Sequence, residues 1–276
     1  ASVPAGLERL PQIPIPVRDI YLASSSVPDL FLQMDALDTV RYTSTDAPSW
    51  RIPELRDAVE DEQIYYIGKY SAPDYEALLT EGCGLVGENT MILHNPATKE
   101  KLEALGFPVL VEYSSYEPHP LGRVEWIRLY GLLCGRLTEA EAFFDRQAET
   151  FQSVEGEEPL HKTVAFFHIT ANGGVVVRRR ADYITRMIEL AGAETAVTDL
   201  PASDNALSTE TIQMESFYAQ ARDADVLIYN STVAGDVTAL DSFLAQHPLL
   251  KDFKAVQTLK FLPYSPQTYL LQISLL

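Results

Sequence analysis

The segment VLVEYSSYEPHPLGRVEWIRLYGLLCG, residues 109–135, joins a short apolar run to a long helical pattern through a polar turn with two prolines. Residues 109–111 form the kind of apolar run that fills a covered parallel sheet. After Gly122 the apolar positions recur at helical spacing: Val124, Ile127, Leu129, Tyr130, Leu132 and Leu133. A strand, a turn and a long helix midway along the chain predict two lobes joined by a stiff helix over 123–134.

The rest of the chain alternates strand and helix patterns on both sides of this segment. In the first half we expect strands at 20–23, 40–43, 84–86 and 109–111, and helices at 29–37, 53–61, 73–80 and 96–105. In the second half we expect strands at 163–169, 195–197, 225–229 and 254–261, and helices at 139–151, 181–191, 214–221 and 237–245. This alternation predicts an α/β protein with two Rossmann-like lobes, parallel-sheet cores and a cleft between the lobes. The expected boundaries are an N-terminal lobe over 1–122, a connecting helical region over 123–153 and a C-terminal lobe over 154–276.

Composition excludes several functions. The 276 residues include 39 acidic and 21 basic side chains, a formal charge of −18, which repels nucleic acid and anionic membranes. No apolar run approaches the roughly 18–20 residues that span a bilayer, and an export signal would have to precede Ala1. The two cysteines, Cys83 and Cys134, fit no zinc or redox spacing. Cys134 is expected in the core, and a disulfide between the two stays open for an exported protein.

Four phrases of the chain resemble the solute-binding proteins of ABC importers whose two lobes are bridged by one rigid helix. They are SSYEPHPLGRVEWIRLYG (114–131), LEALGFPVLV (102–111), YITRMIELAG (183–192) and ESFYAQARDADVLIYNST (215–232). The resemblance extends over most of the chain from about Ile20 onward. That class handles iron–siderophore complexes, haem, corrinoids and some bare metals.

The resemblance implies a role, partners and a location. A small ligand, an iron chelate or a tetrapyrrole-type compound, would be captured and delivered to a membrane permease and its ATPase. In similar proteins one exposed glutamate on each lobe docks on permease arginines, and Glu76 and Glu215 match those positions. The protein would be an extracytoplasmic monomer, lipid-anchored through a removed N-terminal segment, without a cofactor or a catalytic residue.

Polar side chains at predicted strand ends form the candidate ligand site, because ligands of open α/β sheets bind beyond the carboxyl ends of the strands. The alternative for each loop is that its polar residues only solvate a turn. The candidate ligand-binding residues are Ser25, Lys69, Tyr70, Glu88, Asn89, Tyr113, Ser115, Tyr116, His168, Arg178, Arg180, Asn230, Ser231 and Tyr264.

The arginines, aromatic rings and histidines narrow the ligand chemistry. Guanidinium groups of Arg178 and Arg180, on one face of a strand, suit carboxylate, phosphate or catecholate oxygens. Fourteen tyrosines favour a flat aromatic ligand, although core packing is the simpler role for Tyr229. The five histidines are scattered, so we expect no metal site on the protein itself.

Other function classes have weaker support. The sequence Gly82–Gly87 matches G-x-G-x-x-G, but a helix precedes it and the strand lies inside it, which is the wrong context for dinucleotide binding. No nucleophile elbow or zinc-protease motif appears. An enzyme that acts on a small anionic substrate, or a module that senses a ligand for a partner protein, remain the two alternatives.

Overall fold

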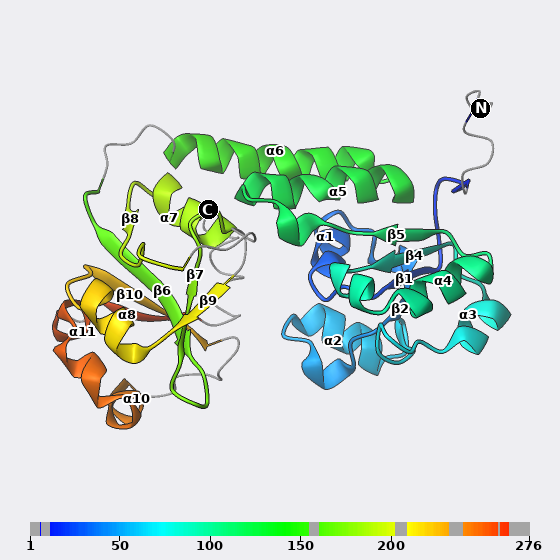
Figure 1. Ribbon diagram of the computed structural model, residues 1–276. Coiled ribbons are helices and arrows are strands. Elements are labelled where there is room, and N and C mark those ends of the chain that lie inside the picture. The colour runs from blue at the N-terminus through cyan, green and yellow to red at the C-terminus, as the bar shows by residue number, and fades with distance from the viewer. Residues whose placement is uncertain are drawn as a thin grey trace. The chain divides into compact units, whose positions relative to one another are not determined.

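The computed structural model describes residue 6 and residues 12–154, 160–201, 209–231, 240–258 and 260–264. The chain divides into two compact units: unit 1 comprises Ala1–Ser115 and Leu121–Arg146, and unit 2 comprises Tyr116–Pro120 and Gln147–Leu276. Each unit is built on its own β-sheet (Figure 1). The predicted two-lobed α/β class is therefore confirmed.

Unit 1 contains a five-stranded sheet, all parallel, in the order β3-β2-β1-β4-β5. The strands are β1 (Ile20–Leu22), β2 (Val40–Thr43), β3 (Tyr65–Tyr66), β4 (Leu85–Glu88) and β5 (Val109–Val111). Every residue of the central strand β1 is buried, as expected for a strand that helices cover on both faces. The prediction missed β3, because two exposed tyrosines at the edge of a sheet have no apolar run to reveal them.

The helices of unit 1 begin at recognisable signals. They are α1 (Val27–Gln33), α2 (Pro53–Glu60), α3 (Tyr75–Glu81) and α4 (Pro96–Ala104), with 3₁₀ turns η1 (Leu37–Thr39), η2 (Ala47–Ser49), η3 (Thr90–His94) and η4 (Ser114–Tyr116). Proline is the first residue of α2 and α4, where its missing N–H costs nothing. The Asp74 carboxylate caps α3 by accepting hydrogen bonds from the backbone N–H groups of Glu76 and Ala77, both at 3.0 Å.

Alternating residues of β1 serve two different cores. Ile20 and Leu22 pack in a cluster with Phe31 of α1, whereas Tyr21 packs in a cluster with Leu78 of α3 and with α4. Cys134 lies in the first cluster and Cys83 packs against the second, so the two thiols lie on opposite faces of the sheet. Both are free cysteines, which excludes the disulfide that the sequence left open.

Two long helices follow β5, as predicted: α5 (Pro120–Cys134) and α6 (Leu137–Val154). They pack closely at Gly131, where an added Cβ would lie 2.5 Å from the Cβ of Ala140. Gly135, with φ +74°, makes the turn between them. The boundary between the units falls inside α6, after Arg146.

Unit 2 contains a mixed sheet in the order β11-β10-β6-β7-β9, with β8 also paired to β6. Its strands are β6 (Thr163–Ile169), β7 (Val175–Arg178), β8 (Glu194–Thr195), β9 (Thr209–Ile212), β10 (Val226–Asn230) and β11 (Phe261–Tyr264). The strands β8, β10 and β11 are parallel to their partners, but β7 is antiparallel to both β6 and β9. The prediction of a wholly parallel sheet is therefore wrong for this hairpin. The turn after Ile169 closes with a 2.8 Å bond from Thr170 N to Gly174 O and is too short for a parallel crossover.

The helices of unit 2 correct one more prediction. They are α7 (Tyr183–Leu190), α8 (Met214–Ala221), α10 (Leu240–Gln246), α11 (Lys254–Gln257) and the 3₁₀ turn η5 (Pro248–Asp252). Residues 254–257 are helical, whereas the sequence predicted a strand from 254 onward. Ala255 and Val256 are buried, and an apolar run this short has no period that separates helix from strand. The first residues of the helix predicted at 237–245 lie outside the described residues.

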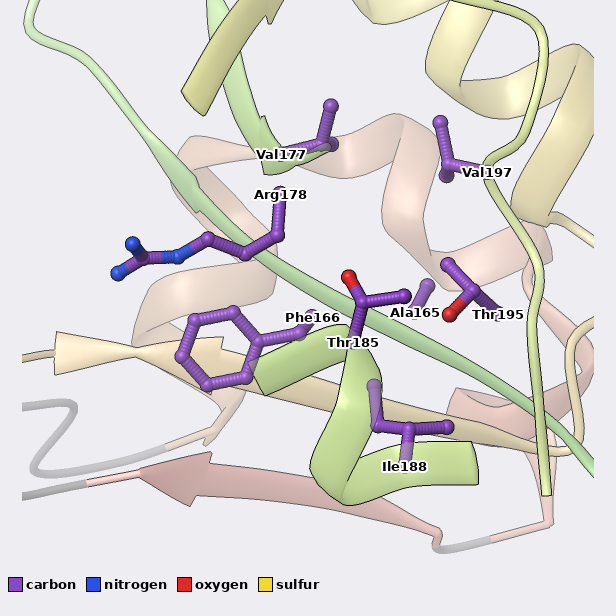
Figure 2. A pocket seen from close by; sticks show the side chains of 8 residues that line it. All are labelled: Ala165, Phe166, Val177, Arg178, Thr185, Ile188, Thr195 and Val197. Atoms are coloured by element: carbon purple, nitrogen blue, oxygen red, sulfur yellow. The ribbon is translucent and has the colours of Figure 1, made fainter. Parts of the chain in front are cut away.

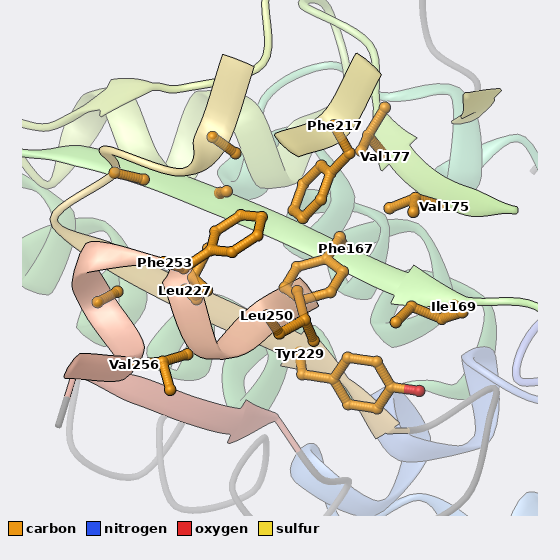
Figure 3. Packing of buried hydrophobic residues seen from close by; sticks show 14 of the residues in the cluster. Phe167, Ile169, Val175, Val177, Phe217, Leu227, Tyr229, Leu250, Phe253 and Val256 are labelled. Atoms are coloured by element: carbon orange, nitrogen blue, oxygen red, sulfur yellow. The ribbon is translucent and has the colours of Figure 1, made fainter. Parts of the chain in front are cut away.

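The main core of unit 2 is a hydrophobic cluster in which several aromatic rings pack against one another (Figure 3). The ring centroid of Phe167 lies 4.6 Å from that of Phe217 and 5.5 Å from that of Tyr229. Phe217 in turn stacks on Phe253 at 5.5 Å. Tyr229 is thus a core residue, as its packing alternative predicted. A second cluster, with Phe166 and Ile188, lies on the other face of the sheet, under α7.

Candidate functional site

The carboxyl ends of the five parallel strands bring several predicted residues to one edge of the unit 1 sheet, here called the carboxyl edge. Ser25 follows β1, Lys69 and Tyr70 follow β3, Glu88 ends β4, and Tyr113 follows β5. Tyr113 is 43% exposed. Lys69 and Ser25 are exposed as well, and Lys69 makes no ion pair within the described part of the chain. The edge therefore presents a hydroxyl, an ammonium group and an aromatic ring to solvent.

Glu112, which was not among the predicted site residues, organises this edge. Its carboxylate accepts hydrogen bonds from Ser24 Oγ at 3.0 Å, from Ser114 N at 2.9 Å and from Ser114 Oγ at 2.5 Å. The side chain is buried and links the end of β1 to the turn after β5. Its position directly after the apolar run 109–111 is the only signal in the sequence, and a carboxylate there is more often exposed.

Asn89 positions a neighbouring segment rather than offering a free amide. Its Nδ2 donates to the Ala23 carbonyl at 3.1 Å, and its Oδ1 accepts from Met91 N at 2.8 Å. This cap holds η3 beside the end of β1 and leaves the side chains of Met91 and Leu93 half exposed. Two apolar side chains thus join Tyr113 among the exposed groups of the loops that follow β4 and β5.

Glu88 differs from the other predicted residues at this edge. Its side chain is 0% exposed, and burial raises the pKa of its carboxyl to about 8. The carboxyl is therefore largely neutral at pH 7. A side chain enclosed in this way does not present itself to a ligand at the surface, so Glu88 has a different role from its exposed neighbours.

In unit 2 the strand ends bring His168, Asn230, Ser231 and Tyr264 together. Phe167 pairs with Tyr229, which places Asn230 beside His168, and Asn230 pairs with Tyr264 on the other side. Asn230 and Ser231 are buried, each with 3% exposure. Burial and then the nearby Arg178 guanidinium lower the pKa of His168, so this imidazole is neutral at pH 7.

The predicted arginines Arg178 and Arg180 do not lie with His168 and Asn230 at the strand ends, because β7 runs antiparallel to β6. Val176 pairs with His168, so Arg178 lies two residues back toward the amino end of β6. Its guanidinium pairs with Asp182 at 3.3 Å and lies over the Phe166 ring at 5.6 Å. Arg180 is exposed and lies beyond the end of β7, two residues after Arg178. The sequence could not show this, since it depends on the direction of the hairpin.

Arg179, the residue between these two arginines, is buried. It pairs with Glu210 of β9 and donates to the Pro201 carbonyl at 2.7 Å. Its own carbonyl accepts from Thr185 Oγ1 at 3.0 Å. Arg179 therefore ties β9 and α7 to the end of β7.

We expect Arg179→Met to lower the free energy of unfolding of unit 2 by about 1–3 kcal/mol, because it leaves the half-buried Glu210 carboxylate without its partner. Urea titrations followed by circular dichroism would measure the change. The matched control is Arg180→Met, whose side chain is exposed and should stay within about 0.5 kcal/mol of the parent. Equal losses in both variants would contradict the assignment.

A small pocket lies between the unit 2 sheet and α7 (Figure 2). It is lined by Ala165, Phe166, Val177, Arg178, Thr185, Ile188, Thr195 and Val197. Its empty volume of ≈ 230 Å³ includes open solvent and is below the roughly 300–1,000 Å³ of ligand pockets. The walls are mostly apolar and come from both core clusters, so we regard the pocket as a packing defect between them.

Glu76 and Glu215, the predicted docking residues, occupy equivalent positions in the two units. Each is the second residue of a helix, α3 and α8 respectively, and each is exposed. Neither forms an ion pair with another described residue. Both carboxylates are thus available to a partner.

The described residues contain neither a metal site nor a membrane-spanning helix. Among the described residues, no group of three or more histidine, cysteine, aspartate or glutamate side chains could hold a metal ion. In the same residues no helix is both long and apolar enough to cross a membrane. The G-x-G-x-x-G sequence lies between α3 and the middle of β4, as predicted, and does not open a helix.

Comparison with known proteins decides the family. A family model described as periplasmic binding protein matches residues 35–268, most of the chain. The chain belongs to the periplasmic binding protein family. This periplasmic binding protein also resembles the periplasmic heme binding protein HutB of Vibrio cholerae, with a TM-score of 0.69 and 18% identity over 90% of this chain and 89% of that one.

Two further relatives agree with this family. The iron uptake ABC transporter substrate-binding protein PiuA of Streptococcus pneumoniae has a TM-score of 0.67 and 14% identity over 89% of this chain and 83% of that one. An uncharacterized lipoprotein of Methanocaldococcus jannaschii is 25% identical over 85% of this chain. The present periplasmic binding protein spans 61% of that relative's length. Together these likenesses confirm the fold and the family that the sequence phrases suggested.

Proposed function

We propose that this protein is the extracytoplasmic binding component of an ABC importer that captures an iron chelate or a tetrapyrrole-type compound. The family match over residues 35–268 carries the proposal. Solved structures with the same fold are named as haem-binding and iron-uptake proteins, which supports this ligand class. The lipoprotein relative supports a lipid anchor on the outer face of a membrane.

In unit 1 the proposed ligand contacts are the exposed Ser25, Lys69 and Tyr113 and the partly buried Tyr70, with the apolar side chains of η3 close in sequence to Asn89. An ammonium group can pair with a carboxylate or catecholate oxygen, and aromatic rings give a flat ligand a large contact area. In unit 2 the proposed contacts are His168 and the ends of β10 and β11.

Delivery would use the two exposed glutamates. Glu76 and Glu215 project from the first turns of α3 and α8, and carboxylates in such positions can form charge-assisted bonds with arginines of a permease. The proposal is a binding function followed by release to the permease and ATPase complex. It requires no catalytic group on this chain.

Titration with candidate ligands tests the binding step. We expect one compound among haem, a ferric siderophore and cobalamin to quench the fluorescence of Trp50 and Trp126 in a saturable manner, with micromolar or tighter affinity, which corresponds to about −8 kcal/mol or better. A visible absorption band of the complex would identify the ligand chemistry. Absence of binding to all three compounds would overturn the ligand class.

Lys69 offers a sharper version of this test. We expect Lys69→Met to weaken an anionic ligand by about tenfold, because one charge-assisted bond is lost. Lys99→Met is the control, since Lys99 pairs with Glu103 on the exposed side of α4. Equal affinities in parent and Lys69→Met would remove Lys69 from the site.

A further inference from the structure

Glu88 is enclosed in unit 1 with no partner for its carboxyl group. Both Oε atoms are buried and form no hydrogen bond with any described residue. Tyr21 pairs with Val86 across β1 and β4, so Glu88, two residues on, projects from the same face of the sheet as Tyr21. A buried carboxyl group without a partner is unusual in a folded protein.

No positive charge compensates Glu88 from the elements around it. Among the described residues, the ionisable side chains on this face are Tyr21, Tyr42, Tyr70, Tyr75, Cys83 and Lys101. The Arg41 guanidinium donates to the Tyr42 hydroxyl, and its charge is paired with Asp19 and Glu81. Phenols and thiols are neutral at pH 7, and the Lys101 ammonium is held over the Tyr75 ring at 3.7 Å. The Ser44 hydroxyl donates to the Ala23 carbonyl at 2.8 Å. An ionised Glu88 would therefore need water, which the closed structure excludes.

Glu88 is connected directly to the segments that form the carboxyl edge. It immediately precedes Asn89, whose side chain holds η3 and the end of β1. The chain beyond η3 then holds the loop 68–73, because Asn95 Nδ2 and Thr98 Oγ1 both donate to the Ser71 carbonyl, at 3.2 and 2.8 Å. Entry of water at Glu88 would disturb the segments that carry Lys69, Tyr70 and Met91.

We propose that Glu88 is a proton switch for this edge: with its proton the segments 68–73 and 89–95 stay closed, and loss of the proton lets them open. In the closed state the pKa of Glu88 is about 8, and in an open, hydrated state it returns to about 4.3. Opening is therefore linked to release of one proton between these values. The equilibrium constant for opening should rise about tenfold per pH unit from about pH 5 to about pH 7.5 and level off above about pH 8.

Amide hydrogen exchange tests this switch without any ligand. Protection factors would be measured from about pH 5.5 to about pH 9. They are used because they correct for the rise of intrinsic, base-catalysed amide exchange with pH. We expect protection in residues 86–95 and 68–73 of the parent to fall about tenfold per pH unit below about pH 7.5, while β6 of unit 2 stays constant. Glu88→Gln, which keeps the shape and removes the charge, should show no such slope.

The matched control is Glu100→Gln, on the exposed face of α4, which should behave as the parent does. A parent without the slope, or a Glu88→Gln variant that retains it, would overturn the proposal. If Glu88→Gln fails to fold, carbon-13 NMR of the parent decides: the Glu88 carboxyl must titrate near about pH 8, and titration near about pH 4 would refute the switch.

The effect on ligand binding rests on the proposed function. In the same pH series the compound that bound in the titration above should bind most tightly near about pH 5.5 and weaken as the pH rises, with a weaker trend in Glu88→Gln. A pH-dependent protection factor without any ligand binding would refute the proposed function and leave the switch intact. Ligand binding together with pH-independent protection factors would support the proposed function and refute the switch.

Discussion

Replacement of both Glu76 and Glu215 by alanine should reduce uptake through the permease by at least about tenfold, while ligand affinity stays within about twofold of the parent. Each carboxylate projects from the first turn of a helix and has no ion pair within its own unit among the described residues. Loss of a charge-assisted bond at each unit would weaken docking without touching the strand ends that carry the proposed ligand contacts. Transport into vesicles that contain the permease and ATPase would measure the change.

Glu54 supplies a matched control for this experiment. It is also the second residue of a helix, α2, and it is exposed. Glu54→Ala loses the same favourable interaction with the helix dipole, about 0.3–1 kcal/mol, and should leave uptake unchanged. Equal uptake by the double variant and by Glu54→Ala would refute the docking role. A loss of ligand affinity in the double variant would show instead that the glutamates serve the binding site.

Phe167→Ala should destabilise unit 2 by about 3–5 kcal/mol, the largest change that we expect from a single substitution. Phe167 is 0% exposed and lies against the rings of Phe217 and Tyr229 in the main cluster of unit 2. Removal of the ring loses its burial and leaves a cavity that tightly packed neighbours cannot fill. Amide exchange in β6 and β10 would measure the loss.

Fluorescence offers an internal comparison, because Trp50 and Trp126 both lie in unit 1. A variant that destabilises unit 2 alone should speed amide exchange in β6 and β10 and leave the tryptophan emission of unit 1 unchanged. Leu160→Ala, in unit 2 with a 59% exposed side chain, should stay within about 0.5 kcal/mol of the parent. A loss below about 1 kcal/mol for Phe167→Ala would show that this core can repack around the gap.

Sequence patterns predicted most of the fold correctly, and their failures have physical causes. Runs such as 109–111 and 163–169 are apolar enough to identify strands, and α8 begins and ends where the helical spacing predicts. The strand β5 (109–111) is only partly buried, because it lies at the edge of its sheet. The edge strands β3 and β9 were missed, since exposed residues at an edge have little apolar pattern. The interior strand β7 was not among the expected strands either. The strand β7 is antiparallel to β6 because the turn that joins them is short. The residues of 175–178 themselves do not indicate this direction.

The candidate site was predicted in part. Ser25, Lys69 and Tyr113 do reach one edge of a parallel sheet, because all parallel strands end on the same side. Arg178 did not join His168 at the strand ends, because the hairpin turns it toward the other end of β6. Glu112 was missed altogether, since its importance depends on hydrogen bonds from Ser24, which is 88 residues away in the chain.

The sequence alone was sufficient for the class of fold, the two lobes, the paired helices and the family phrases, because apolar periodicity and local capping act over a few residues. Tertiary structure decided strand direction, the burial of Arg179 and the partners of each carboxylate. Glu88 and Glu112 are both acidic residues at strand ends, yet one is enclosed without a partner and the other accepts three hydrogen bonds. Their environments are made by residues distant in the chain, so the sequence around each glutamate does not reveal which environment it has.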